Sequence, residues 1–193
     1  TLQNSLAFML IFLSLRLGAT ICPDAIQITS FPVINQPLVC GSSNDLNSTT
    51  VSGSCGSTSN SYKNGLEALY KWTPSTSGTY QISYSGQTWS AIFVYQGCPN
   101  MGGTCVGSVG SSTNSKTLTI NLTGSVEYFI WFDTWPSPPS PCPGTFSIDV
   151  PPPPPANDEC SGAIAFPSIP TDGSCSTVMV NTNFATQSQP ACL

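Results

Sequence analysis

The residues with the most definite chemistry in this chain are its cysteines, because its 193 residues include nine cysteines and no histidine. The lack of histidine excludes Ser-His-Asp and Cys-His catalytic arrangements and every metal site that needs an imidazole ligand. The cysteines lie at Cys22, Cys40, Cys55, Cys98, Cys105, Cys142, Cys160, Cys175 and Cys192. None of their spacings is the C-x-x-C of zinc sites. In a chain with an export signal they predict disulfide bonds and a secreted or cell-surface location.

The favoured disulfides are Cys98–Cys105, Cys22–Cys40 with its counterpart Cys160–Cys175 in a sequence repeat, and Cys55–Cys142. The first would close a hairpin tip, because the glycines in the loop let the chain turn back. The second recurs in both copies of the repeat, and the third follows by elimination. Other connectivities among six cysteines stay open. The three cysteines after position 156 are an odd number, which predicts a partner beyond Leu193.

A tryptophan in a proline-rich loop is the residue that could contact a ligand. Trp135 begins the sequence WPSPPSPC, which holds too many prolines for the interior of a sheet. An aromatic ring on a stiff loop can stack on sugars or on a Pro-rich partner, and we consider Trp89 and Asp133 as further contacts. The alternative is that Trp135 caps the open end of the fold. Trp72 and Trp131 lie within predicted strands and are predicted core residues.

The remaining charged residues favour binding over catalysis. Two carboxylates could hydrolyse a glycoside without histidine, but no spacing places any two of Glu67, Glu127 and Asp133 together. We therefore predict no enzymatic activity, no cofactor and no metal site. Only 4 residues are basic against 9 acidic, and this excludes nucleic acid as a partner, because phosphate binding needs clustered Lys and Arg.

From Ile21 onward the sequence pattern is that of strands. Gly78–Ser85 and Lys116–Leu122 alternate between apolar and polar residues, as strands with one buried face do. Ser125–Asp133 is apolar on both faces, which predicts a central strand covered on both sides. Further strands are predicted at Leu69–Thr73, Ser90–Gln96 and Thr145–Val150, and weaker ones at Ala25–Thr29 and Thr49–Ser52. Short strands joined by polar turns predict an all-β fold, an antiparallel β-sandwich or jelly roll, over residues 21–150.

Residues 1–20 contain a twelve-residue apolar run, Leu6–Leu17. A membrane-spanning helix needs about 20 apolar residues, so no membrane span is predicted. The length suits the apolar region of a signal peptide, followed by small residues at which cleavage could occur. The alternative is a pilin-like helix that stays and packs in a filament, although the acid that type IV pilins place near its start is missing.

The five prolines of Pro151–Pro155 divide the chain. They predict a stiff polyproline II linker over residues 151–156. After it, Cys160-Ser-Gly-Ala-Ile164 repeats the pattern of Cys22-Pro-Asp-Ala-Ile26. Residues 157–193 therefore predict an incomplete second β module, because they can supply only two or three strands.

Several motifs resemble disulfide-bearing repeats of large secreted bacterial surface proteins. They are the N-D-E-C-x-x-A-I opening at Asn157–Ile164, the stretch Leu69–Tyr80, the run Val94–Cys105 and the tract Glu127–Phe146. These repeats resemble the pre-peptidase C-terminal domain, a jelly-roll-like β-sandwich appended to secreted proteases and adhesins. The resemblance implies an accessory module. The first module opens with Ile-Cys-Pro-Asp instead, and the tract after Cys105 lacks the acidic cluster of many relatives, so a family-type calcium site is not expected.

Together these observations predict a non-catalytic extracellular repeat of a larger secreted or surface protein. Its expected partners are an extracellular carbohydrate or protein surface and the neighbouring repeats of the same chain. One alternative is an accessory domain of a secreted hydrolase whose catalytic domain lies outside this fragment. Another is a structural subunit of an extracellular fibre, assembled by strand donation.

Overall fold

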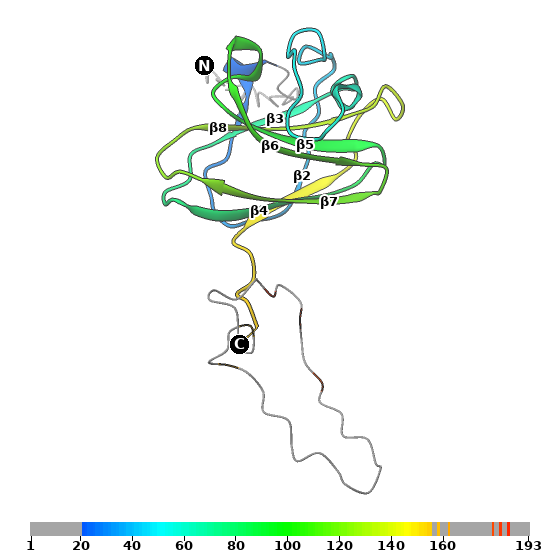
Figure 1. Ribbon diagram of the computed structural model, residues 1–193. Helices are drawn as coiled ribbons and strands as arrows, with labels where there is room; N and C mark the ends of the chain where they lie inside the picture. Colours follow the sequence, from blue (N-terminus) through cyan, green and yellow to red (C-terminus); the bar gives the residue numbers. More distant parts are fainter. Residues whose placement is uncertain are drawn as a thin grey trace, which may run out of the picture. The chain divides into compact units, whose positions relative to one another are not determined.

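The computed structural model describes residues 21–155 and the single positions 158, 162, 179, 182 and 185. The chain divides into two units, Thr1–Val150 and Pro151–Leu193. The strands of the described residues all belong to the first unit, where they form two sheets (Figure 1). The predicted all-β sandwich is confirmed. The signal peptide over 1–20, the second module over 157–193 and its Cys160–Cys175 pair lie outside the described residues. Pro151–Pro155 forms neither helix nor strand.

The larger sheet has five strands in the order β1-β3-β8-β5-β6. Its strands are β1 (Ile26–Gln27), β3 (Ala68–Trp72), β8 (Tyr128–Thr134), β5 (Ser90–Gln96) and β6 (Thr104–Ser111). The smaller sheet has the order β2-β9-β4-β7, with β2 (Val33–Pro37), β9 (Thr145–Asp149), β4 (Gly78–Ser85) and β7 (Ser115–Leu122). Neighbouring strands are antiparallel except β1, which runs parallel to β3.

Three differences separate these strands from the predicted set. Thr49–Ser52 is a turn, because the side-chain oxygen of Asn47 accepts hydrogen bonds from the amides of Thr49 and Thr50. β2 and β6 were not predicted. β8 begins three residues later than predicted, because Ser125 has a φ of 62° and belongs to the preceding turn.

Two hydrophobic cores hold the sheets in place. The first lies between the sheets, where the alternating residues of β4 and β7 meet Tyr70, Ile92 and Phe132 from the larger sheet. The second lies on the outer face of the larger sheet. There Leu46, Val51 and Tyr62 of the long connection from residue 41 to residue 67, which we call the covering loop, pack over Phe93 and Trp131.

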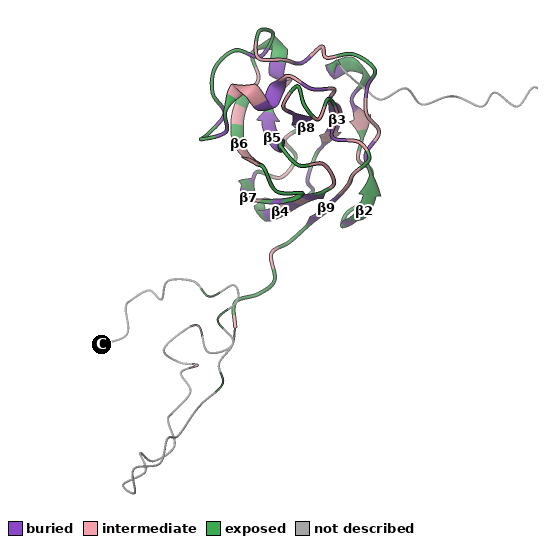
Figure 2. Cartoon of the chain, turned by 90° about the vertical axis from the view of Figure 1, so that its right-hand side faces the viewer, coloured by how far each residue is buried: buried purple, intermediate pink, exposed green. Residues whose placement is uncertain are grey.

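The covering loop explains why β8 is apolar on both faces. All seven β8 residues are buried, as the pattern of a doubly covered strand predicted. Trp72 and Trp131 are also core residues, as predicted. Figure 1 shows the loop in cyan on the side of the larger sheet that faces away from β4 and β7, and Figure 2 shows the edge strand β2 as exposed.

The six cysteines of the first unit form disulfides Cys22–Cys98, Cys40–Cys142 and Cys55–Cys105, so the three predicted pairings are wrong. The hairpin between β5 and β6 explains the first error. Its tip is closed by the Gly103 amide, which donates to the Cys98 carbonyl, while Cys105 pairs in register with Tyr95. The two sulfur atoms are therefore out of register. Cys105 instead forms a disulfide with Cys55 of the covering loop, and Cys98 forms one with Cys22 in the segment before β1.

Close packing of the covering loop requires a glycine in β6. A Cβ atom added at Gly110 would lie 2.8 Å from the Thr58 methyl carbon and 3.1 Å from the Tyr62 ring. We expect Gly110→Ala to lower the free energy of unfolding by about 1–3 kcal/mol, because the loop must shift to admit the methyl group. Gly78→Ala is the matched control, since its Cβ would meet no atom within 4 Å. Urea denaturation of both variants checks this expectation, and equal midpoints would contradict it.

Candidate ligand-binding sites

Trp89 and Trp135 lie together at one end of the larger sheet. Ser90 at the start of β5 pairs with Thr134 at the end of β8, so the two tryptophans flank the same end of one ladder. Their ring centroids are 5.4 Å apart with an interplanar angle of 60°, and the Trp135 amide donates to the Trp89 carbonyl at 2.9 Å. Tyr62 of the covering loop packs edge-on against Trp135 at 5.7 Å. The register thus brings together two candidate residues that the sequence alone could not place side by side.

Trp89 presents its ring to solvent from a strained backbone. Its side chain is 45% exposed, whereas Trp135 is half-buried beneath it. The φ of Trp89 is 51°, a left-handed conformation that costs a bulky residue on the order of 1–3 kcal/mol. The hydrogen bond from Trp135 and one from the Ser90 hydroxyl to the Gln87 carbonyl hold this turn. The result is an exposed indole on a rigid aromatic support, which is how proteins present a stacking surface.

The structure buries Asp133 completely, so its prediction as a ligand contact is corrected. The residue is fully buried, because Asp133 lies two residues after Trp131 on the face of β8 that the covering loop hides. One carboxyl oxygen accepts hydrogen bonds from the amides of Gly65 and Thr134. Burial raises the pKa of Asp133 well above its ordinary value; these hydrogen bonds oppose the rise and the Glu67 carboxyl adds to it.

Glu67 is the other buried acid, and the fold brings it near Asp133, which no sequence spacing indicated. Its Oε1 accepts hydrogen bonds from the amides of Asp45 and Leu46 at 2.9 Å. Burial raises the pKa of Glu67 to about 7, while the hydrogen bonds lower it and the Asp45 carboxyl raises it. Both carboxyl groups are closed to solvent and therefore cannot reach a glycoside. Glu127 is exposed in a separate turn.

Lys63 of the covering loop is buried near these acids, and its side chain binds other residues of the same loop. Its ammonium group donates to the carbonyls of Val51 and Gly53 and lies 5.6 Å from the centroid of the Phe93 ring. Burial lowers the pKa of Lys63, and the charge of Asp133 opposes that effect. In the part of the chain that the structure describes, no group of three or more Cys, Asp or Glu residues could hold a metal ion. The hydrogen bonds of Lys63 and Glu67 hold the backbone of the covering loop.

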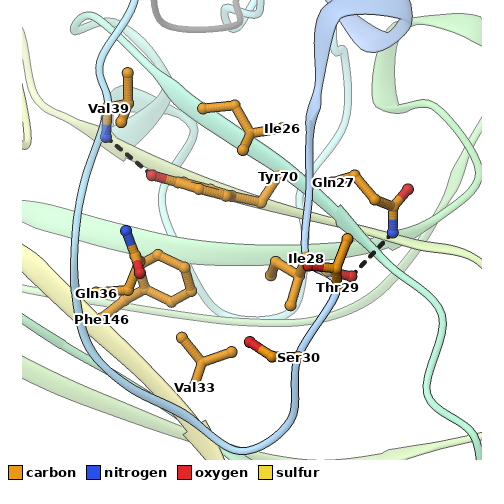
Figure 3. A pocket seen from close by; sticks show the side chains of 10 residues that line it. All are labelled: Ile26, Gln27, Ile28, Thr29, Ser30, Val33, Gln36, Val39, Tyr70 and Phe146. Atoms are coloured by element: carbon orange, nitrogen blue, oxygen red, sulfur yellow. Dashed lines mark hydrogen bonds between the residues drawn. The ribbon is translucent and has the colours of Figure 1, made fainter. Parts of the chain in front are cut away.

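A cavity of about 350 Å³ lies between β1 and β2, which are edge strands of the two sheets (Figure 3). Tyr70 and Phe146 form its floor, and the Tyr70 hydroxyl accepts a hydrogen bond from the Val39 amide at 2.9 Å. A second cavity of about 230 Å³ adjoins it, with Ile28, Thr29 and Ser30 lining both. Sequence patterns did not indicate this region, because β2 and the residues before it lack alternation.

Comparisons with known proteins give weak likenesses. No family model and no curated protein matches the chain. One similar solved structure is the carbohydrate-binding module CsCBM6-3 from Clostridium stercorarium in complex with cellobiose, at 19% identity and a TM-score of 0.29. That alignment covers 46% of this chain and 70% of the module. Another is the module CBM6cm-2 from Cellvibrio mixtus lichenase 5A in complex with cellotriose, at 17% identity and a TM-score of 0.28, covering 44% and 70%.

Helices long and apolar enough to cross a membrane are absent from the described residues.

Proposed function

We propose that this chain is a non-catalytic extracellular module that binds neutral carbohydrate through the Trp89 indole. The exposed ring of Trp89 is the observation that carries the proposal. The C–H faces of sugar rings are apolar and pack on indole faces, while their hydroxyl groups stay in water or bind polar neighbours. Trp135, which itself packs against Tyr62, holds the ring, so little conformational entropy is lost when a sugar binds.

The surroundings of Trp89 support a neutral ligand. The adjoining turn supplies Gln87 and Thr88, whose side chains carry amide and hydroxyl groups without charge. Lys116 beside this turn is buried, and its ammonium group donates to the Gln87 carbonyl. The two acids of the neighbouring structured region, Glu67 and Asp133, are buried. Three disulfides support an oxidising, extracellular location. The absence of histidine and the burial of these acids support binding without turnover.

We also propose that the module is one repeat of a larger secreted or surface protein. The stiff Pro151–Pro155 linker and the N-D-E-C-x-x-A-I sequence after it support this part of the proposal. The resemblance of that sequence to pre-peptidase C-terminal repeats supports the same assembly. The full open reading frame tests it, since a parent without further copies of the pattern would contradict a repeat protein.

Calorimetric titration of the full chain with soluble neutral polysaccharides tests the binding site. We expect Trp89→Ala to weaken binding about tenfold or more, because a supported aromatic anchor dominates the free energy of binding. Met101→Ala is the matched control, since Met101 is a large apolar side chain that is 78% exposed on another loop. Binding that survives Trp89→Ala unchanged would contradict the assignment of this residue.

A second variant separates binding from folding. Trp89→Gly removes the ring and also relieves the left-handed strain at this position, because glycine adopts positive φ freely. We expect the variant to lose binding at the Trp89 position, with an unfolding midpoint at or above that of the parent chain. A loss of binding that accompanies a fall in midpoint in both variants would point to a structural role for Trp89 instead.

A further inference from the structure

The two cavities beside β1 and β2 adjoin through a shared wall. Ile28, Thr29 and Ser30 line both, so the two cavities are neighbours along this segment. We call the two cavities with this wall the edge groove. Figure 3 shows the end of the groove between β1 and β2, with Val33, Gln36 and Phe146 on the side of the smaller sheet. Phe31 and Trp72 mark its other end.

Phe31 is an exposed ring with a rigid aromatic support. Its side chain is 44% exposed. It stacks on Trp72 at 5.6 Å with an interplanar angle of 20°, and it meets Tyr80 edge-on at 5.6 Å. Trp72 and Tyr80 are themselves buried and 5.0 Å apart. A half-exposed phenyl ring on buried aromatic neighbours is a second stacking surface of the kind that Trp89 forms.

The lining of the edge groove is polar but carries no formal charge. Among the residues that line the two cavities none is Asp, Glu, Lys or Arg. The polar members are hydroxyl and amide side chains: Gln27, Thr29, Ser30, Gln36, Thr73, Ser75 and Thr76, with the hydroxyl groups of Tyr70 and Tyr80. The Gln27 amide nitrogen donates to the carbonyls of Ile28 and Lys71, which leaves its oxygen to accept a hydrogen bond from a ligand. This lining suits a ligand with many hydroxyl groups and no charge.

The backbone beside the groove disfavours an extended peptide. A peptide that adds to a sheet needs a regular free edge with unpaired amide and carbonyl groups. The register of β2 shifts between Val33 and Gln36, and Asn35 there has a φ of 47° and donates its amide to the Ser147 hydroxyl. Pro37 has no amide hydrogen, and β1 is only two residues long. These features protect the edge from strand addition.

We infer that the edge groove is a second carbohydrate site, which binds a neutral oligosaccharide chain with one sugar ring stacked on Phe31. The inference rests on the proposed ligand class and adds a site apart from Trp89. Trp72 beneath Phe31 pairs with Tyr128 at the start of β8, while Trp135 follows the end of that strand. The two sites therefore lie near opposite ends of β8, about 20 Å apart for a seven-residue strand. One module with two sites binds a long polysaccharide by avidity.

The test is calorimetry and amide NMR of the full chain with neutral hexasaccharides of the glucan, xylan and mannan types. We expect Trp89→Gly to retain one binding equivalent. In that variant the added oligosaccharide should shift the amide signals of Thr29, Ser30 and Phe31. Adding Phe31→Ala to it should weaken that equivalent about tenfold. Phe31→Leu, which keeps an apolar cover on Trp72 but lacks the flat ring, should weaken binding similarly and guards against misfolding. Ile34→Ala, at a 62% exposed residue of β2 outside the lining, is the control.

The outcomes separate this inference from the proposed function. If Trp89→Gly removes all binding and no signal of residues 28–31 shifts, the inference fails while the Trp89 site stands. If Phe31→Ala alone removes all binding, the groove stands and the Trp89 site fails. Preferential binding of an extended peptide, with shifts in the β2 amides, would overturn the inference, as would the absence of glycan binding altogether.

Discussion

Replacing Cys40 and Cys142 together with serine is expected to lower the free energy of unfolding by about 5 kcal/mol. This disulfide joins residues 102 positions apart, the longest separation of the three, so it removes the most freedom from the unfolded chain. It also ties the residue just before the covering loop to the connection before β9. Since domains of this size are stable by only about 5–15 kcal/mol, the variant should unfold over a much lower range of denaturant.

Denaturant unfolding of the double variant measures this effect, and the Cys55–Cys105 pair supplies the comparison. That disulfide spans 50 positions, so the same argument gives a loss of about 4 kcal/mol. Double variants that match the parent chain would contradict these pairings. A large loss when Cys98 and Cys105 are replaced together, equal to the sum of two disulfides, would agree with them, because these cysteines belong to different bonds.

The second large effect is a rise in stability on mild acidification. The pKa of Glu67 is about 7 in the folded chain against an ordinary value of 4.5. Between these pH values the folded state binds more protons than the unfolded state, so the free energy of unfolding falls as pH rises. The difference corresponds to about 3 kcal/mol between pH 4.5 and pH 7. Asp133, whose pKa is also raised by burial, acts in the same direction.

Glu67→Gln tests the origin of this dependence. Glutamine keeps an oxygen that can accept from the amides of Asp45 and Leu46, but it carries no charge at any pH. We expect the variant to be more stable than the parent at pH 8 and to show a flatter profile between pH 5 and pH 8. Thermal melts across this range measure both. A parent chain that loses stability from pH 7 to pH 5, or a variant with an unchanged slope, would contradict the burial of this carboxyl.

Much of the fold could be predicted because strand alternation is a local signal. Gly78–Ser85 and Ser90–Gln96 were predicted at the bounds that the structure shows. β6 was missed because Gly107 and Gly110 weaken its pattern. A Cβ atom at these positions would lie 3.0 Å from a side-chain carbon of Ile120 and 2.8 Å from the Thr58 methyl carbon. β2 was missed because most of its residues are exposed and it includes a proline. The disulfide pairings depend on which distant segments meet, which local patterns do not contain.

The candidate sites were predicted in part. Trp89 and Trp135 were named from residue type and loop composition, but only the register of β5 and β8 joins them. The burial of Asp133 did have a signal in the sequence: a strand covered on both faces buries every member, and Asp133 belongs to that strand. Phe31 had none, because its ring packs on Trp72 and Tyr80 from two different sheets.

Electrophoresis of the full chain through gels that contain neutral polysaccharides tests the central claim most directly. We expect retarded migration in at least one glucan, xylan or mannan gel, without release of reducing ends. The retardation should weaken in Trp89→Gly and persist in Met101→Ala. Unchanged mobility in every gel, or hydrolysis of the polysaccharide that retards the chain, would contradict a non-catalytic carbohydrate-binding module.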